Sequence, residues 1–281
     1  MSIETIVPGV YIEEDATPAL SVSQGATAVQ LFVGNFEPLD STNAGKLIRI
    51  SGWLEFSQLF TVNSTGYSAS ATITPKAATT SEEYDEAAPQ GGGTTTRAAG
   101  SETEYDVSDP KVTPNTTTLA LQLYFQNGGN PCYVYALASA TSSAETAGIV
   151  TALDEGDDIT LLVALDDDGT YRNAVYGAVA SALGQNKGYF LIADSEDGSV
   201  PTSAQGSSHV GVYYPSLSVT AGKLNEREVV ITDKTDSANP VTKTLAELRQ
   251  TSPVAANQLA STLSASIPTS LSIAPSAVMA G

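Results

Sequence analysis

The sequence predicts an α/β fold in which a mostly parallel or mixed sheet is covered by helices. Between residues 116 and 214, short apolar runs alternate with segments of helical period, which is typical of a sheet with helices on its faces. Two stretches rich in small and polar residues interrupt this pattern, and an extended segment precedes it. We therefore expect an α/β core with an extended N-terminal arm and β-rich polar surface insertions.

The elements of the core follow from the spacing of apolar residues. The clearest helix is expected at residues 171–183, because Tyr171, Val175, Tyr176 and Val179 share one helical face. Strands are expected at residues 28–34, 46–50, 132–137, 159–165, 189–193 and 210–214, and further helices at residues 116–126 and 144–153. Residues 25–60 and 116–220 are thus predicted to form the core.

The two polar stretches are predicted as surface insertions. Residues 61–115 contain few large apolar side chains and form either a loose insertion or a small outer domain built on short alternations such as residues 71–74. Residues 221–269 are expected to form a second insertion, with a hairpin of residues 228–232 and 241–244 and an Ala-rich helix at residues 253–263.

Residues 1–24 are predicted as an extended arm and linker. Pro8 and Pro18 disfavour a helix, and the residues around them favour β structure. Such an arm is either a frayed terminus or a strand that joins the sheet of another subunit. The residues assigned to this subunit-interaction arm are Ile6, Val7, Val10, Tyr11, Ile12 and Glu13.

A series of short motifs begins in the arm and continues along the chain in a fixed order. They are the Pro-Gly-Val-Tyr-Ile-Glu-Glu opening from Pro8, Trp53 with Phe56 and Phe60, Asn127-Gly128-Gly129, Tyr213-Tyr214-Pro215, and Pro275 to Gly281. In this order the motifs resemble those of contractile tail sheath proteins, which occur in phage tails, pyocin-like particles and phage-derived injection machines. Each motif alone is weak, since Asn-Gly-Gly is a common end of a helix.

The resemblance implies a structural subunit that stacks around an inner tube, exchanges strands with its neighbours and contracts by subunit repacking to drive the tube through a target envelope. Its partners would be other copies of itself, the inner tube protein, and baseplate and terminal cap proteins. It would assemble in the bacterial cytoplasm and then form part of a phage tail or a released extracellular particle. Residues 270–281 are expected as a loop leading to the family's C-terminal domain, which this chain lacks. We expect a truncated, processed or incompletely represented chain, with a naturally short variant as the alternative.

Two other functions are considered. One is a baseplate-proximal or terminal sheath paralogue. The other is an α/β enzyme or nucleotide-binding module that uses the acidic residues 166–168 and 194–197, because ligands gather at the carboxyl ends of parallel strands and carboxylates hold Mg²⁺ or transfer protons. We favour a simpler interpretation, in which these acids form solvated turns and helix N-caps, with Asp168 before the helix at residues 171–183.

Composition argues against several other classes of protein. The net charge of −19 disfavours nucleic-acid binding, which needs clustered Lys and Arg. The single histidine, His209, and the single cysteine, Cys132, are too few for a zinc site of several His and Cys, and no phosphate-binding glycine motif is present. Cys132 is expected to be a small buried apolar residue. We therefore expect no catalytic, cofactor-binding or metal-binding residues, no cofactor and no direct membrane insertion.

Overall fold

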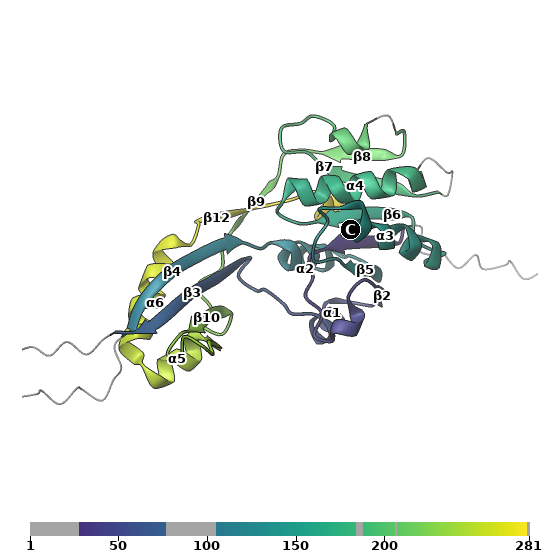
Figure 1. The fold of residues 1–281 in the computed structure, drawn as a ribbon. Coiled ribbons are helices and arrows are strands. Elements are labelled where there is room, and N and C mark those ends of the chain that lie inside the picture. Colours follow the sequence, from purple (N-terminus) through teal and green to yellow (C-terminus); the bar gives the residue numbers. More distant parts are fainter. Residues whose placement is uncertain (1–27, 77–104, 184–187, 206, 280–281) are drawn as a thin grey trace, which may run out of the picture.

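A computed structural model describes residues 28–76, 105–183, 188–205 and 207–279 of the chain. These residues form two domains, which lie side by side in Figure 1. The core domain contains a six-stranded sheet, and the distal domain contains a four-stranded sheet. The arm residues Ile6 to Glu13 lie outside the described residues.

The core sheet has the strand order β2-β5-β1-β6-β7-β8. Strand β2 is antiparallel to β5, and the other neighbouring strands are parallel. Every residue of β1 is buried, as expected for a central strand covered on both faces. The strands are β1 (Gln30–Gly34), β2 (Leu47–Ile50), β5 (Cys132–Ala136), β6 (Leu161–Leu165), β7 (Phe190–Asp194) and β8 (Val210–Tyr213).

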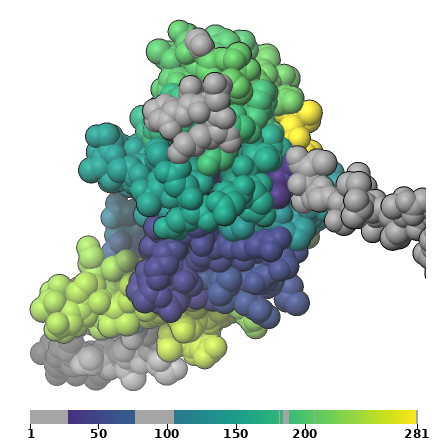
Figure 2. All heavy atoms as spheres, turned by 90° about the vertical axis from the view of Figure 1, so that its right-hand side faces the viewer, coloured from purple at the N-terminus to yellow at the C-terminus, as the bar shows by residue number. Residues whose placement is uncertain are grey.

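Helices cover both faces of this sheet. On one face, α3 (Ser143–Glu155) and α4 (Gly169–Leu183) pack on Leu31 and Val33 of β1. On the other face, α1 (Trp53–Leu59), α2 (Thr117–Gln126) and α7 (Ser276–Met279) pack with Phe32 of β1. In Figure 2 most of the visible purple part of the chain, which includes β2 and α1, lies below the teal part that includes α3 and α4. The core is therefore a three-layer α/β/α domain, completed by the short helices η1 (Ser41–Asn43) and η2 (Thr202–Ala204).

Helix α1 shows how an aromatic spacing determines local structure. Trp53, Phe56 and Phe60 lie three and four residues apart, so their rings fall on one side of a helical turn. The ring centroids of Trp53 and Phe56 are 5.3 Å apart, and those of Phe56 and Phe60 are 4.9 Å apart. This stack fixes α1 against the sheet, where Phe56 is completely buried.

The distal domain has the strand order β11-β10-β3-β4, with helices on one face. Strand β3 alternates strictly, so that Tyr67, Ala69, Ala71 and Ile73 face the helices. Strand β3 pairs in parallel with β10, and the other pairs are antiparallel. The elements are β3 (Tyr67–Pro75), β4 (Tyr105–Pro114), β10 (Val229–Asp233), β11 (Val241–Thr244), α5 (Leu245–Thr251) and α6 (Pro253–Ser266).

The chain passes between the domains at four crossings, which we call the neck: residues 61–66, 115–116, 214–228 and 267–275. Within the neck, β9 (Leu217–Thr220) and β12 (Ser270–Ile273) form an antiparallel ribbon, which joins the two domains in Figure 1. Gly66 has a φ of +78°, and a Cβ atom there would lie 2.5 Å from Leu271 Cδ1. A glycine is therefore favoured at this point of the neck, because another residue would be strained by the positive φ and would displace the Leu271 side chain.

The α/β fold class with a mixed sheet is confirmed, and most core elements lie within a few residues of their predicted positions. The two stretches expected as separate insertions instead contribute strands to one sheet, because β3 pairs with β10. Residues 270–279, expected as a loop, form β12 and α7. Strand β4 was not predicted individually. It contains Pro110, which is tolerated because β4 is an edge strand with an irregular register at that point.

Candidate functional site

The acidic residues that follow β6 lie at the carboxyl edge of the core sheet and are bound to nearby backbone. Asp166 Oδ1 accepts a hydrogen bond from the Asp168 N–H at 2.9 Å, and Asp168 Oδ1 accepts one from the Thr170 N–H at 2.7 Å. Asp168 therefore caps the first turn of α4, as predicted. Burial raises the pKa of Asp166, partly offset by its hydrogen bond from Asp168.

Asp167 has a longer-range partner. Its carboxylate accepts hydrogen bonds from both the backbone N–H and the hydroxyl of Thr116, the residue that precedes α2, and the N–H bond is 2.8 Å long. The Thr116 side chain itself forms no capping bond within its helix, so Asp167 supplies the cap from another element. This contact was not predicted from the sequence.

Asp194, the last residue of β7, is buried rather than exposed in a turn. Its carboxylate accepts hydrogen bonds from the Ser276 N–H at 2.8 Å and from the Ser276 hydroxyl at 2.6 Å. Burial raises the pKa of Asp194, while the two bonds from Ser276 and the charge of Arg172 act in the opposite direction. The turn interpretation is therefore wrong for Asp194, although Asp197 does form a turn through its bond from the Ser199 N–H.

Arg172 of α4 lies between these acidic segments and is almost fully buried. Its guanidinium donates hydrogen bonds to the Asp166 carbonyl oxygen and, at 3.1 Å, to Glu196 Oε1. A hollow of about 420 Å³ adjoins Arg172 and is also lined by Asp168, Asp194 and Glu196. The carboxylates of Asp168, Asp194 and Glu196 accept hydrogen bonds from the protein itself, whereas the buried Nε of Arg172 has no hydrogen-bond partner among the described residues. Across the described residues, no cluster of His, Cys, Asp and Glu could hold a metal ion.

The neck contains a second polar cluster, centred on Asn63. The Asn63 side chain accepts hydrogen bonds from the N–H groups of Thr65 and Gly66, at 3.1 and 3.0 Å, and donates one to the Tyr67 carbonyl at 2.9 Å. Its backbone N–H and C=O both bond to the Thr118 hydroxyl of α2. Asn63 therefore joins the start of the distal domain to a core helix, and this role was also missed in the sequence.

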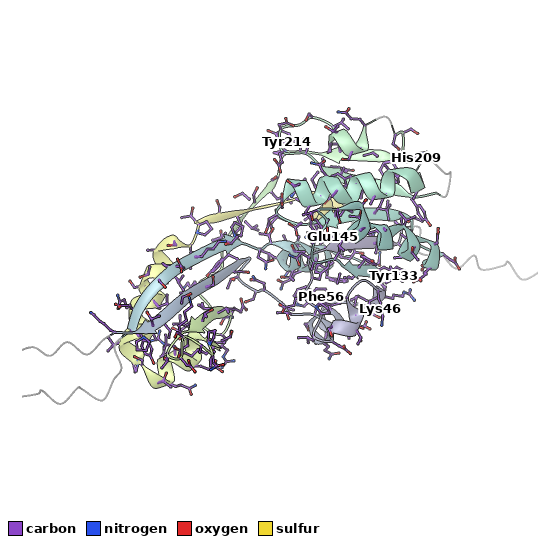
Figure 3. The ribbon with its side chains drawn as sticks, viewed as in Figure 1. Lys46, Phe56, Tyr133, Glu145, His209 and Tyr214 are labelled. Carbon is purple, nitrogen blue, oxygen red and sulfur yellow. The ribbon has the colours of Figure 1, made fainter. Side chains whose placement is uncertain are left out.

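The single histidine and the single cysteine lie apart from the acidic edge. His209 comes just before β8, at the amino edge of the parallel sheet, whereas Tyr214 lies at the other end of this strand (Figure 3). Cys132 is completely buried in β5, and burial raises its pKa to about 12. The prediction of a small buried cysteine is confirmed. The described helices also include none with the length and apolarity needed to cross a membrane.

Two solved structures are similar to the chain over 99% of its length. One is the cryo-EM structure of the anti-feeding prophage (AFP) helical sheath in the contracted state, with 35% sequence identity, 51% of that chain covered and a TM-score of 0.55. The other is the cryo-EM structure of the AFP baseplate, with 36% identity, 52% of that chain covered and a TM-score of 0.53. The chain therefore spans about half the length of the chains it matches. No protein-family model and no curated protein matches it.

Proposed function

This chain is a contractile tail sheath-like protein, and we propose that it is a structural sheath subunit that polymerises around an inner tube. The observation that carries the proposal is the similarity to the AFP helical sheath over nearly the whole chain. The order of the sequence motifs, which resembles that of contractile tail sheath proteins, also supports the proposal. The motifs lie in the arm, at α1, after α2, at the end of β8 and around α7.

The proposed link between subunits is the N-terminal arm. Ile6, Val7, Val10, Tyr11, Ile12 and Glu13 would add a strand to the sheet of a neighbouring copy. Each backbone hydrogen bond contributes only about 0.5–1.5 kcal/mol, but the bonds of one arm repeat at every subunit. The result is a continuous mesh that can shorten without separating, with residues 15–24 as the linker.

Contraction in this proposal requires no nucleotide. Subunits would repack from an extended to a shorter lattice and drive the tube through a target envelope, with an inner tube protein, a baseplate and a terminal cap as partners. The particle would assemble in the bacterial cytoplasm and act as part of a phage tail or as a released extracellular particle. The similarity to chains of both a helical sheath and a baseplate supports this set of partners.

The arm is tested by deleting residues 1–14 in the gene of the complete particle. We expect the subunit to fold, because the described domains begin at residue 28, and long sheaths to be absent in electron micrographs. Val10→Pro and Tyr11→Pro should each reproduce the defect by removing one backbone donor.

Glu14→Gln is the matched control, since it changes a side chain at the end of the arm but keeps every backbone donor. Extended sheaths of normal length from the deletion variant would show that the arm does not link subunits. Loss of sheaths with Glu14→Gln would show that the arm links subunits through its charge and not through strand pairing.

A second candidate function is a specialised sheath copy close to the baseplate. The similarity to a chain of the AFP baseplate structure favours it, because the identity is as high as to the sheath. Gold labelling of a tagged chain in assembled particles separates the two functions. Labels along the whole tail indicate a bulk sheath subunit, and labels confined to one end indicate the specialised copy.

We also propose that the chain is not an enzyme. The carboxylates at the ends of β6 and β7 are bound to the chain's own backbone and hydroxyl groups, which supports a structural role for them. Adding Mg²⁺ alone or Mg²⁺ with ATP should leave the melting temperature of the purified chain unchanged. A rise that disappears with Asp166→Ala would contradict this.

A further inference from the structure

The two crossings by which the chain returns from the distal domain enter the core at equivalent places. Thr116 follows β4 and precedes α2, and Ser276 follows β12 and begins α7. Helices α2 and α7 contact each other on the same face of the core sheet. Both return crossings therefore end at the amino end of a helix beside the carboxyl edge of that sheet.

At each of these two entry residues, Thr116 and Ser276, a carboxylate from the end of a core strand accepts hydrogen bonds. Asp167 follows β6 and Asp194 ends β7, and these are neighbouring parallel strands. Each carboxylate accepts one backbone N–H and one hydroxyl, from Thr116 in the first case and from Ser276 in the second. Hydrogen bonds to a charged acceptor are stronger than neutral ones, and an anion is favoured at a helix amino end.

The Asp194 contact lies where water cannot replace it easily, whereas Asp167 is exposed and only its partner Thr116 is buried. Ser276 is completely buried, Asp194 is 5% exposed, and Thr116 is 4% exposed. Taking a carboxylate out of water is costly unless its partners are well placed, and breaking such a pair leaves an uncompensated buried charge. The geometry of Asp194 is therefore strongly determined: its backbone N–H also donates to the Tyr176 hydroxyl at 3.0 Å.

The outgoing crossings are joined to the same region. Asn63 in the first crossing bonds twice to Thr118 of α2, two residues after Thr116. The Gly222 N–H in the third crossing donates to the Thr65 carbonyl at 3.1 Å, which connects the third crossing to the first. All four crossings thus form one hydrogen-bonded unit at the end of the core sheet.

We propose that Asp167 and Asp194 are positioning residues that hold the distal domain in a fixed orientation on the core. The two domains then move as one rigid body. The rigid connection itself is argued from the contacts above, and only its role in contraction rests on the proposed sheath function. In that role, a displacement of the core during subunit repacking would carry the distal domain with it. The acidic strand ends, which in the sequence suggested a metal or catalytic site, would act as mechanical clamps.

The test measures the distance between the domains in the isolated full chain. Spin labels are placed on exposed residues through Thr151→Cys on α3 and Ser261→Cys on α6, in a Cys132→Ala background. Double electron–electron resonance then gives the distribution of distances. We expect a narrow distribution for the parent chain, and a broad one with additional distances for the Asp167→Asn, Asp194→Asn double variant.

The matched controls are Asp168→Asn and Asp197→Asn, which remove carboxylates of the same two segments that bond only to their own turn or helix. These should keep the narrow distribution. A milder pair, Thr116→Val with Ser276→Ala, removes only the hydroxyl donors and should broaden the distribution to a smaller extent.

An unchanged distribution in the folded double variant would overturn the proposal. If the double variant does not fold, an unchanged distribution in the hydroxyl pair would overturn it equally. Because the measurement uses unassembled chains, it is independent of the arm experiment. Normal sheaths from the arm deletion would refute the linking role of the arm and leave the clamps untouched.

Discussion

The core and distal domains both bury an apolar layer between a sheet and helices, but the chain builds them differently. In the core, β6, α4, β7 and β8 follow one another, so β6 pairs with β7 and β7 with β8 over short lengths of sequence, although β1 pairs with the much later β5 and β6. In the distal domain, β3 pairs with β10, which lies about 160 residues further along the chain. The distal sheet therefore forms only when two distant segments meet.

The way helices cover the two sheets indicates that the distal domain depends on the core more than the reverse. The distal domain is one sheet with helices on a single face, whereas the core sheet is covered on both faces. The core should therefore remain folded when the distal domain opens. Cys132 makes this testable, because a buried thiol with a raised pKa reacts with thiol reagents only when the core opens.

The largest effect is expected for Phe32→Ala in β1. Phe32 is completely buried against Tyr124, with ring centroids 4.8 Å apart, so the change leaves a large cavity in the centre of the core. We expect a loss of about 3–5 kcal/mol of unfolding free energy and much faster labelling of Cys132. Chemical denaturation and thiol labelling measure both. Phe32→Leu, which keeps most of the volume, should lose less, and equal losses would argue against a cavity effect.

The second-largest loss of stability is expected for Leu259→Ala in α6, which opens a cavity in the distal domain. Leu259 is completely buried there, and a loss of about 2–5 kcal/mol is typical for such a change. We expect hydrogen exchange to increase in β3 and β10, while Cys132 labelling stays at the parent rate. Val254→Ala on the exposed side of α6 is the control. Labelling of Cys132 as fast as in Phe32→Ala would show that the domains unfold together.

A smaller effect is expected in the neck, for Gly66→Ala. The positive φ of Gly66 costs an L-residue about 1–2 kcal/mol, and the added methyl group would contact Leu119 and Leu271. The melting temperature should fall. Gly52→Ala, where a Cβ meets no atom within 4 Å, should have little effect. A stable Gly66→Ala protein would mean that the neck adapts, which would also weaken the rigid-body proposal.

The smallest loss of stability is expected at the helix caps, because both domains contain a helix that begins with a capping box. Glu145 of α3 and Glu247 of α5 each complete a capping box, with Ser142 and Thr244 respectively. Hydrogen bonds from Thr141 and Ser142 lower the pKa of Glu145 to about 2, and a hydrogen bond from Thr244 lowers the pKa of Glu247. Glutamine at either position should therefore destabilise its own domain slightly at neutral pH.

The pH dependence follows from the direction of these shifts. The ionised Glu145 stabilises the folded state fully above its unfolded pKa of about 4.5, and this contribution disappears as the pH falls toward 2. The difference in stability between the parent and Glu145→Gln should thus vanish in acid. A difference that grows in acid would contradict the capping account.

The sequence alone determined the α/β core, because its signals are local. Apolar strands such as Leu161–Leu165 and the amphipathic face of Gly169–Leu183 are encoded by neighbouring residues, as is the cap formed by Asp168. The burial of Cys132 could also be predicted, because this residue lies in an apolar strand. The sheath resemblance also came from short motifs, which can be recognised without knowing how the chain folds.

The tertiary structure alone decided the distal sheet and the role of the acidic strand ends. No local pattern pairs β3 with β10, and Asp194 looks like any residue of an acidic turn until Ser276, 82 residues later, lies beside it. A carboxylate's preference for water or for burial depends on which donors surround it in space. The order of residues fixes the elements of this protein, whereas contacts between distant segments fix how its two domains are joined.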